Sequence, residues 1–266
     1  MLCLLFTLVS CSGMYYHPSP TKFYDPKDFG LEYEIRQFQS KDGTQLHGWY
    51  LPAENSKGLI LFYHGNAENI SSHFLNLAWI TRFNYDVFIF DYRGYGRSGG
   101  NPHPEGIYYD SLAALEYAQK LNRTNRLIVY GQSLGGNIAF RAVQDSSVKV
   151  DELILDSTFL SYQDMAFEKL TEIWPLIPFS PLAYLLFNDH YASARGIDKL
   201  QSMRSLVIHG EYDKIVPLKF GKEVFEKLKA SRKLFWSIPK GRHTDIFHRE
   251  NKIWRKKFLD YLNSKS

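Results

Sequence analysis

The chain has 266 residues, 44% of them hydrophobic and 16% aromatic, a composition that excludes a disordered protein and supports a sizeable core. Its 32 basic and 28 acidic residues leave a net charge of +4. The one basic cluster, in residues 251–266, alternates with apolar residues at helical spacing, which is typical of the exposed face of a terminal helix. The composition therefore gives no indication of binding to DNA or RNA.

The two cysteines, Cys3 and Cys11, both lie near the N-terminus. The rest of the chain therefore cannot hold a disulfide framework, a cysteine-rich zinc site or a cysteine nucleophile. Residues 1–11 predict a secretory signal peptide. Their apolar run has the length of the hydrophobic region of such a signal, and it is shorter than the roughly 20 residues that span a bilayer.

The predicted signal ends in Leu8-Val9-Ser10-Cys11, which resembles a bacterial lipobox, where the cysteine is lipidated and becomes the mature N-terminus. We therefore expect a lipoprotein of the bacterial cell envelope, anchored to the membrane through Cys11. No Lys or Arg precedes the apolar run, so a non-functional signal and a cytoplasmic protein remain the alternative. Residues 12–30 contain three prolines and no periodicity, and are expected to form a tether or an irregular arm.

From Leu31 onward, strand and helix patterns alternate. Residues 31–40 and 44–52 alternate apolar and polar side chains around a Lys-Asp-Gly turn, and predict a hairpin. Further strands are predicted at 58–65, 85–94, 126–131, 150–157, 205–213 and 233–239. Helical patterns occupy 72–83, 108–121, 137–143, 220–230 and the C-terminal residues. The order predicts one α/β domain, 31–266, with a mostly parallel central sheet and helices on both faces.

Residues 157–204 interrupt this alternation. About fifty residues separate two strands there, although a β–α unit needs far fewer. The segment is rich in Trp, Phe, Leu and Pro, and follows the carboxyl end of a strand, so we expect a short helical lid above the sheet. Part of its apolar surface is expected to line a substrate pocket, with Trp174 and Phe179 as lining residues. Packing of these side chains between the lid and the body remains the alternative.

The sequence Gly131-Gln132-Ser133-Leu134-Gly135 lies between a predicted strand and a predicted helix. Small residues two positions before and after a serine are typical of a nucleophile elbow, where larger side chains would collide. Ser133 would then lie at a helix N-terminus, where unpaired N–H groups and the helix dipole favour negative charge. A plain strand-to-helix turn with small residues is the alternative.

Candidate partners for this serine follow other predicted strands. Asp213 lies at the end of the segment predicted as a strand at 205–213, with Glu211 and Asp156 as rival acids. His243 lies in the loop after the last strand, and His248 is a weaker competitor a turn further on. The order serine, acid, histidine along the chain matches one of the known orders of a Ser-His-Asp triad.

The loop after the strand at 58–65 contains His64-Gly65-Asn66-Ala67, and a backbone N–H from it can point at the space above the serine. Leu134, at the helix start, supplies a second N–H, and two such donors would form an oxyanion hole. We expect His64 itself to hold the loop and not to act as the base.

Five motifs together resemble the α/β-hydrolases of the depalmitoylase-like and serine-aminopeptidase-like branch: FYHGNAENI, DYRGYGRSGG, GQSLGG, HGEYDKIVP and GRHTDIF. The resemblance extends from about Leu31 to the C-terminus. It implies an α/β-hydrolase fold, with Ser133 as nucleophile, His243 as base and Asp213 as its orienting acid. It also implies backbone N–H donors at Asn66 and Leu134, and a structural loop at Arg93–Gly96. Relatives usually have glycine immediately before the histidine, where this chain has Arg242.

We therefore expect a serine hydrolase that cleaves carboxylic esters or thioesters through an acyl-enzyme, without metal or organic cofactor. A small-molecule or acylated substrate and the membrane are the expected partners. An aminopeptidase is one alternative, which would need acidic groups in the lid such as Glu168 and Glu172 to hold a free amine. A catalytically inactive, lipid-anchored binding protein is another. The substrate and the oligomeric state stay open.

Overall fold

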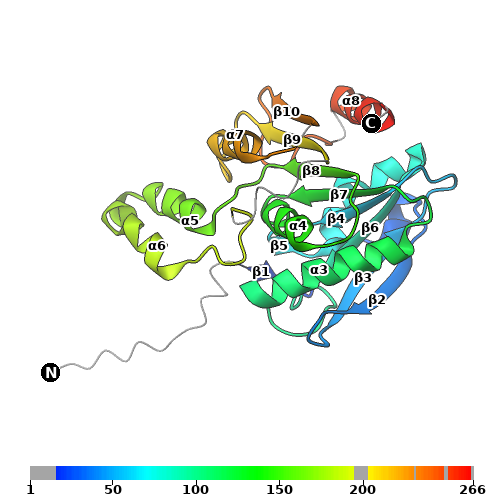
Figure 1. Cartoon of the computed structure of the whole chain (residues 1–266), viewed down its shortest axis with the longest axis horizontal. Coiled ribbons are helices and arrows are strands. Elements are labelled where there is room, and N and C mark those ends of the chain that lie inside the picture. Colours follow the sequence, from blue (N-terminus) through cyan, green and yellow to red (C-terminus); the bar gives the residue numbers. More distant parts are fainter. Residues whose placement is uncertain (1–15, 195–202, 231, 249–250, 265–266) are drawn as a thin grey trace.

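The computed structural model describes residues 16–194, 203–230, 232–248 and 251–264. An eight-stranded sheet forms its centre (Figure 1), in the order β10-β9-β8-β7-β4-β6-β3-β2. The strands are β2 Glu34–Gln39, β3 Gln45–Leu51, β4 Leu59–Tyr63, β6 Asp86–Asp91, β7 Leu127–Gln132, β8 Glu152–Asp156, β9 Arg204–Gly210 and β10 Arg232–Ile238. β3 pairs antiparallel with β2 and with β6, and the other neighbours are parallel. The expected hairpin and mostly parallel sheet are confirmed.

The central strands are apolar in their middle positions because both of their faces are covered. Every residue of β4, β6, β7 and β8 is buried. Leu59, Leu61 and Tyr63 of β4 point into one core, and Ile60 and Phe62 into the other, as the two-residue period of a strand requires.

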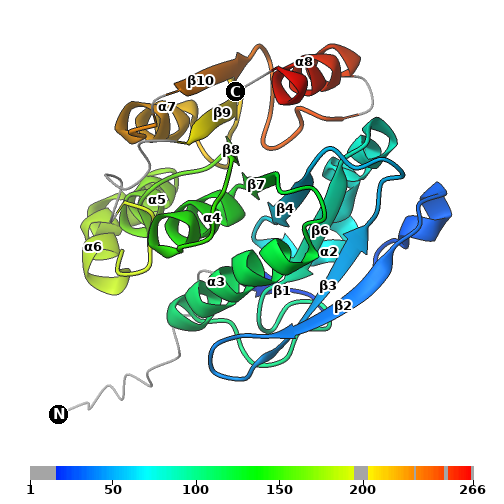
Figure 2. The same cartoon turned by 45° about the vertical axis from the view of Figure 1, so that its right-hand side comes forward.

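Helices cover both faces of the sheet (Figures 1 and 2). The first core contains side chains of α3 (Pro104–Leu121), α4 (Leu134–Asp145) and α7 (Leu218–Lys227). The second contains side chains of α2 (Ile70–His73), η2 (Phe74–Asn76), η3 (Ala78–Phe83) and α8 (Lys252–Asn263). The continuous helix predicted at 72–83 is wrong, because the backbone leaves the helical region at Leu77 (φ −121°, ψ −9°) and the segment divides into short turns.

Between β8 and β9 the chain forms α5 (Tyr162–Thr171), η4 (Trp174–Leu182) and α6 (Ala183–Leu186), which lie beyond the carboxyl end of β8 (Figure 1). The buried amide of Asn137 on α4 holds both ends of this segment. Its Nδ2 donates to the carbonyls of Phe159 and Leu160, and its Oδ1 accepts from the N–H of Ser193. The segment is thereby fastened to the helix that begins at Ser133.

The described part of the expected arm, residues 16–30, lies against the body. β1 (His17–Pro18) pairs in parallel with β5 (Ala67–Glu68), and η1 (Pro26–Phe29) follows. Nδ2 of Asn69 donates to the carbonyls of Ser19 and Thr21. Cys3 and Cys11 lie outside the described residues. Among the helices that the structure describes, none is long and apolar enough to cross a membrane.

Candidate active site

Ser133 lies at the junction of β7 and α4 in a strained backbone conformation. Its φ of 55° and ψ of −124° are unusual for a residue that carries a Cβ. Two contacts hold it there: the Ser133 N–H donates to the carbonyl of Asp156 at 2.8 Å, and Thr158 Oγ1 donates to the Ser133 carbonyl at 2.6 Å. The turn that the sequence predicted at this serine is therefore present and fixed from outside.

The two outer glycines of the elbow are required by close backbone contacts. A Cβ at Gly135 would lie 2.2 Å from the carbonyl oxygen of Tyr63, and one at Gly131 would lie 2.6 Å from Cα of Gly136. Both distances are far inside van der Waals contact. The start of α4 therefore packs directly on the end of β4, which brings the loop after β4 beside the serine.

The structure brings Ser133, His243 and Asp213 together in one hydrogen-bonded line. Nε2 of His243 lies 2.9 Å from Oγ of Ser133, and Nδ1 of His243 lies 2.8 Å from Oδ2 of Asp213. The other oxygen of Asp213 accepts from the N–H groups of Ile215 and Val216, both at 2.9 Å. With Nδ1–H directed at the carboxylate, Nε2 is free to take the serine proton.

Asp213 is buried and remains ionised at neutral pH. Burial by itself raises the pKa of this carboxyl, but the hydrogen bond from His243 and the two backbone donors outweigh it and hold the pKa below the usual 3.8. Its negative charge therefore stabilises a positively charged imidazole at His243.

The rival acids and the rival histidine point elsewhere. Glu211 is exposed and accepts from Ser237 Oγ. Asp156 is buried and accepts from the hydroxyls of Tyr130 and Ser157, and burial raises its pKa to about 6. His248 is exposed on the wall of a different cavity, beside Trp79 and Arg255. None of the three side chains is hydrogen-bonded to the side chains of Ser133, His243 or Asp213.

Arg242 is accommodated immediately before His243. Its backbone is outside the left-handed region and its side chain is exposed. The tight packing is instead at Gly210, which contacts this loop in space. A Cβ there would lie 2.5 Å from the carbonyl oxygens of both Gly241 and Arg242. A glycine is therefore needed under the histidine loop, at the end of β9, and not at position 242.

Asn66 and Leu134 line the same cavity as Ser133. Oδ1 of Asn66 accepts from the His17 N–H, and Tyr95 Oη lies within hydrogen-bond distance of both oxygens of Asn66. These contacts fix the Asn66 backbone beside the serine. Leu134 is the first residue of α4, so its N–H precedes the internal hydrogen bonds of the helix.

A cavity of about 380 Å³ opens from the serine under the lid segment. Most of its lining is apolar, and among the described residues that line it Lys169 is the one with a formal charge. The lining residues are Asn66, Ser133, Leu134, Phe159, Tyr162, Met165, Ala166, Lys169, Leu170, Leu186, Phe187, Ile215 and Val216. The arrangement places a serine hydroxyl, an imidazole within hydrogen-bond distance of it and an apolar compartment together, as a candidate active site.

A family model described as serine aminopeptidase, S33, matches residues 54–192, just over half of the chain. The chain belongs to this family of α/β-hydrolases. Uncharacterized protein YfhR of Salmonella typhimurium is 32% identical to it, over 99% of this chain and 94% of its own. Lysophosphatidylserine lipase ABHD12 of Danio rerio is 30% identical, over 75% of this chain and 54% of its own.

The esterase Pf2001 of Pyrococcus furiosus shares the fold. Its solved structure superposes with a TM-score of 0.76 at 18% identity, over 93% of this chain and 97% of its own. The predicted α/β-hydrolase fold is therefore confirmed.

The lid residues predicted to line the pocket are corrected by the structure. The side chains of Trp174 and Phe179 are 84% and 55% exposed, and neither lines the serine cavity. Both belong to η4, which follows the lining helix and turns its apolar side chains to the surface. The lining comes instead from α5, whose residues Tyr162, Met165, Ala166, Lys169 and Leu170 recur at helical spacing. That spacing was the available signal.

The acidic lid residues considered for an S33 aminopeptidase do not line the cavity. Glu168 pairs with Lys219, and Glu172 accepts from Lys169 Nζ at 2.8 and 2.9 Å. Within the described ranges, no group of three or more His, Cys, Asp or Glu side chains is placed to hold a metal ion.

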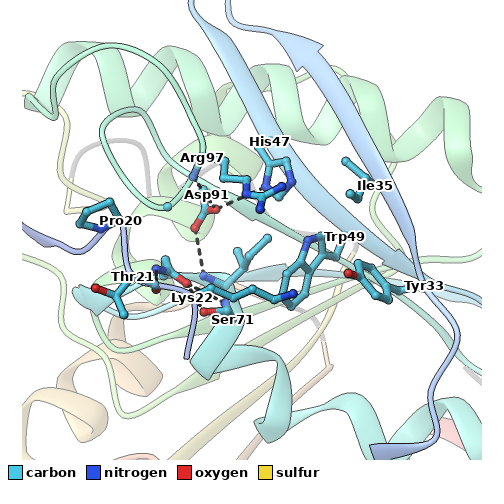
Figure 3. Close-up of a pocket in the computed structure, with 13 residues that line it drawn as sticks. Pro20, Thr21, Lys22, Tyr33, Ile35, His47, Trp49, Ser71, Asp91 and Arg97 are labelled. Atoms are coloured by element: carbon cyan, nitrogen blue, oxygen red, sulfur yellow. Dashed lines mark hydrogen bonds and ion pairs between the residues drawn. The ribbon is translucent and has the colours of Figure 1, made fainter. Parts of the chain in front are cut away.

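Asp91, at the end of β6, was not predicted from the sequence. It lies in a small pocket (Figure 3) and binds the chain where the loop after β4 leads into α2. Its Oδ1 accepts from the Ile70 N–H at 2.9 Å, and Oδ2 lies 3.5 Å from Nδ1 of His47. A Cβ at Gly96 would lie 2.1 Å from the same carboxylate. The small pocket around Asp91, about 40 Å³, does not include Ser133. Its place in the DYRGYG motif was the signal that could have identified it.

The two other motif residues expected to be structural are held within the protein. His64 is fully buried, its Nδ1 lies 2.8 Å from the Gly65 carbonyl, and burial lowers its pKa well below 6.5. Arg93 is buried and binds the carboxylates of Asp110 and Asp42.

Proposed function

We propose that this protein is a serine hydrolase that cleaves carboxylic esters or thioesters and binds the acyl chain in the apolar cavity. The observation that carries the proposal is the 2.9 Å contact between His243 Nε2 and Ser133 Oγ at the floor of that cavity. The name of the zebrafish relative, a lysophosphatidylserine lipase, supports an acyl substrate.

In the proposed mechanism, His243 Nε2 accepts the hydroxyl proton while Ser133 Oγ attacks the carbonyl carbon. Asp213 keeps Nδ1 protonated and stabilises the imidazolium. The N–H groups of Asn66 and Leu134 bind the oxyanion, each contributing about 3–4 kcal/mol to lowering the barrier. His243 then protonates the leaving alcohol or thiol. A water molecule, deprotonated by His243, attacks the acyl-enzyme; the bond to Ser133 Oγ breaks, His243 returns the proton to that oxygen, and the carboxylic acid leaves.

An aminopeptidase activity, the activity in the family's description, is the second candidate. The cavity favours the esterase, because its lining is mostly apolar and, among the described residues that form it, no Asp or Glu is present to bind a free α-amino group. Comparing p-nitrophenyl esters with amino-acid p-nitroanilides in one assay separates the two. Faster cleavage of the anilides would reverse the order of the candidates.

Covalent labelling tests the nucleophile and excludes an inactive binding protein. A fluorophosphonate probe should label the wild-type chain and Ser180→Ala, whose lid hydroxyl donates to the Ile177 carbonyl. Ser133→Ala should not be labelled, and its ester turnover should fall by about 10³-fold or more. Labelling of Ser133→Ala would assign the nucleophile to another residue.

We also propose that residues 157–204 act as the lid of this site. In residues 1–11, the predicted signal, we propose that the part before Cys11 is removed and that Cys11 remains as the lipidated N-terminus. Mass spectrometry of the mature N-terminus from the native host tests the second point. An unmodified chain beginning at Met1 would contradict the lipid anchor.

A further inference from the structure

The outer surface of the lid segment is unusually apolar for an exposed surface. Residues 173–187 contain no charged side chain. Within 173–186, eight large apolar side chains are between 42% and 84% exposed, which we call the lid apolar face: Ile173, Trp174, Ile177, Phe179, Leu182, Tyr184, Leu185 and Leu186. Soluble monomers rarely expose so continuous an apolar surface without a binding role.

The polar groups of this segment are already used inside the lid. Ser180 Oγ donates to the Ile177 carbonyl, and Tyr184 Oη donates to Asp164. The Gln163 amide donates to the carbonyls of Tyr184 and Phe187. Three prolines, at 175, 178 and 181, carry no N–H. A protein partner would find few groups to hydrogen-bond with, whereas hydrocarbon requires none.

The lid apolar face borders the mouth of the serine cavity. Leu186 belongs both to this face and to the lining of the cavity. Ile215, on the loop after β9, also lines the cavity and is 56% exposed. A surface that covered the lid apolar face would therefore also meet the entrance to the site.

The described chain begins beside the residues that line the serine cavity. The first described residues lead into β1, where the His17 N–H donates to Asn66, a residue of the cavity lining. Cys11, where we propose that lipid is attached, lies six positions before His17 in the sequence, a stretch that spans at most about 20 Å. A lipid at Cys11 would therefore hold this end of the molecule near a membrane, which favours a lipid bilayer as the occupant over a second copy of the chain.

We propose that the lid apolar face inserts into the surface of a phospholipid bilayer and holds the mouth of the serine cavity against it. Trp174, the most exposed residue of the face at 84%, lies at the depth of the head groups and upper acyl chains. This contact requires no chemistry at Ser133, so it stands or falls separately from the hydrolase proposal.

Fluorescence of Trp174 tests insertion directly in the full chain. Vesicles of phosphatidylcholine with brominated acyl chains should quench the tryptophan emission of the wild-type protein. Trp174→Phe should lose most of that quenching, because Trp49 and Trp236 are buried and Trp79 and Trp254 are partly buried against the second core. Ser133→Ala should be quenched like the wild type. Bound protein with no quenching through Trp174 would overturn the proposal, even if the N-terminal segment alone anchors it.

Vesicle partitioning provides the matched comparison. The double variant Trp174→Ser, Leu185→Ser should partition at least about tenfold more weakly than the wild type, since two of the most exposed apolar groups are removed. Ile253→Ser, which removes an 80% exposed side chain on α8, should change partitioning less than about twofold. Turnover of a soluble short-chain ester should stay unchanged in both. Equal partitioning of the wild type and the double variant would refute the bilayer as occupant. So would a wild-type dimer that the double substitution dissociates, if brominated vesicles do not quench the wild-type emission.

Discussion

His243 and His248 lie five positions apart, yet only the first is in contact with Ser133. His243 Nε2 is 2.9 Å from the serine oxygen, whereas His248 is exposed in another cavity. We expect His243→Ala to lower kcat on a p-nitrophenyl ester by about 10³-fold or more. His248→Ala should retain at least about half of the activity, as surface substitutions usually do.

Denaturant unfolding of the two histidine variants provides the control. Both histidine variants should unfold at the same denaturant concentration within error, since neither side chain is part of the core. A fully active His243→Ala variant, or an inactive His248→Ala variant, would reassign the base.

The acid at the end of β9 shows how backbone position decides among chemically similar residues. Glu211 and Asp213 are two positions apart, and their side chains leave a turn in different directions. Asp213 lies under the histidine with its second oxygen bound by two N–H groups, while Glu211 faces solvent. The sequence places both acids after a strand, but it does not show in which direction each side chain points.

At the scale of elements, we expect α5 to determine which acyl chains fit the cavity. Met165, Ala166 and Leu170 on this helix line the cavity. If the cavity takes the acyl chain, kcat/KM should rise from acetate toward medium-chain p-nitrophenyl esters, by at most about fourfold for each CH₂. Ala166→Trp would fill the cavity, and should abolish this rise while leaving acetate turnover within about threefold.

Trp174→Ala is the matched lid control for the chain-length series. Its side chain is exposed and outside the cavity, so the dependence on chain length should equal that of the wild type. A flat series in the wild type would show that the acyl chain does not occupy this cavity. If Ala166→Trp showed the same dependence on chain length as the wild type, the acyl chain would have to bind outside this cavity.

At the scale of the whole molecule, local rules were sufficient for the sheet and for the serine turn. Continuous apolar runs give strands with two covered faces, and glycines two positions from Ser133 are required by backbone contacts of 2.2 and 2.6 Å that a Cβ would make. These constraints act over a few residues, so the sequence carries them directly.

The lid and the helix at 72–83 could not be derived in the same way. The apolar η4 faces the surface and the amphipathic α5 lines the cavity, although the sequence favours η4 as the lining. The ends of the lid segment are bound by Asn137 on α4, a residue distant in the sequence. Likewise, packing of Ile70, Phe74 and Ile80 against the sheet overrides the helical periodicity of their segment. Tertiary contacts decided both outcomes.

The stability of the whole fold should depend on the buried carboxyl of Asp156. Burial raises its pKa to about 6, against 3.8 in its usual state, so the folded protein holds this proton more tightly than the unfolded chain. The resulting stabilisation is fully present below pH 3.8 and is lost as the pH rises through 6. Asp213 acts in the opposite sense, because its pKa is lowered, and its contribution is lost only below its usual pKa of 3.8.

Asp156→Asn keeps the shape of the side chain and removes its titration, and the hydroxyls of Tyr130 and Ser157 can each donate to or accept from an amide. From pH 5 to pH 8, the free energy of unfolding of the wild type should fall relative to this variant by about 1.4 kcal/mol. Urea unfolding of both proteins at several pH values measures the difference. Glu211→Gln, at an exposed carboxylate, should give a curve parallel to the wild type. Parallel curves for Asp156→Asn and the wild type would mean that Asp156 stays ionised in the core, held by its two hydroxyl donors.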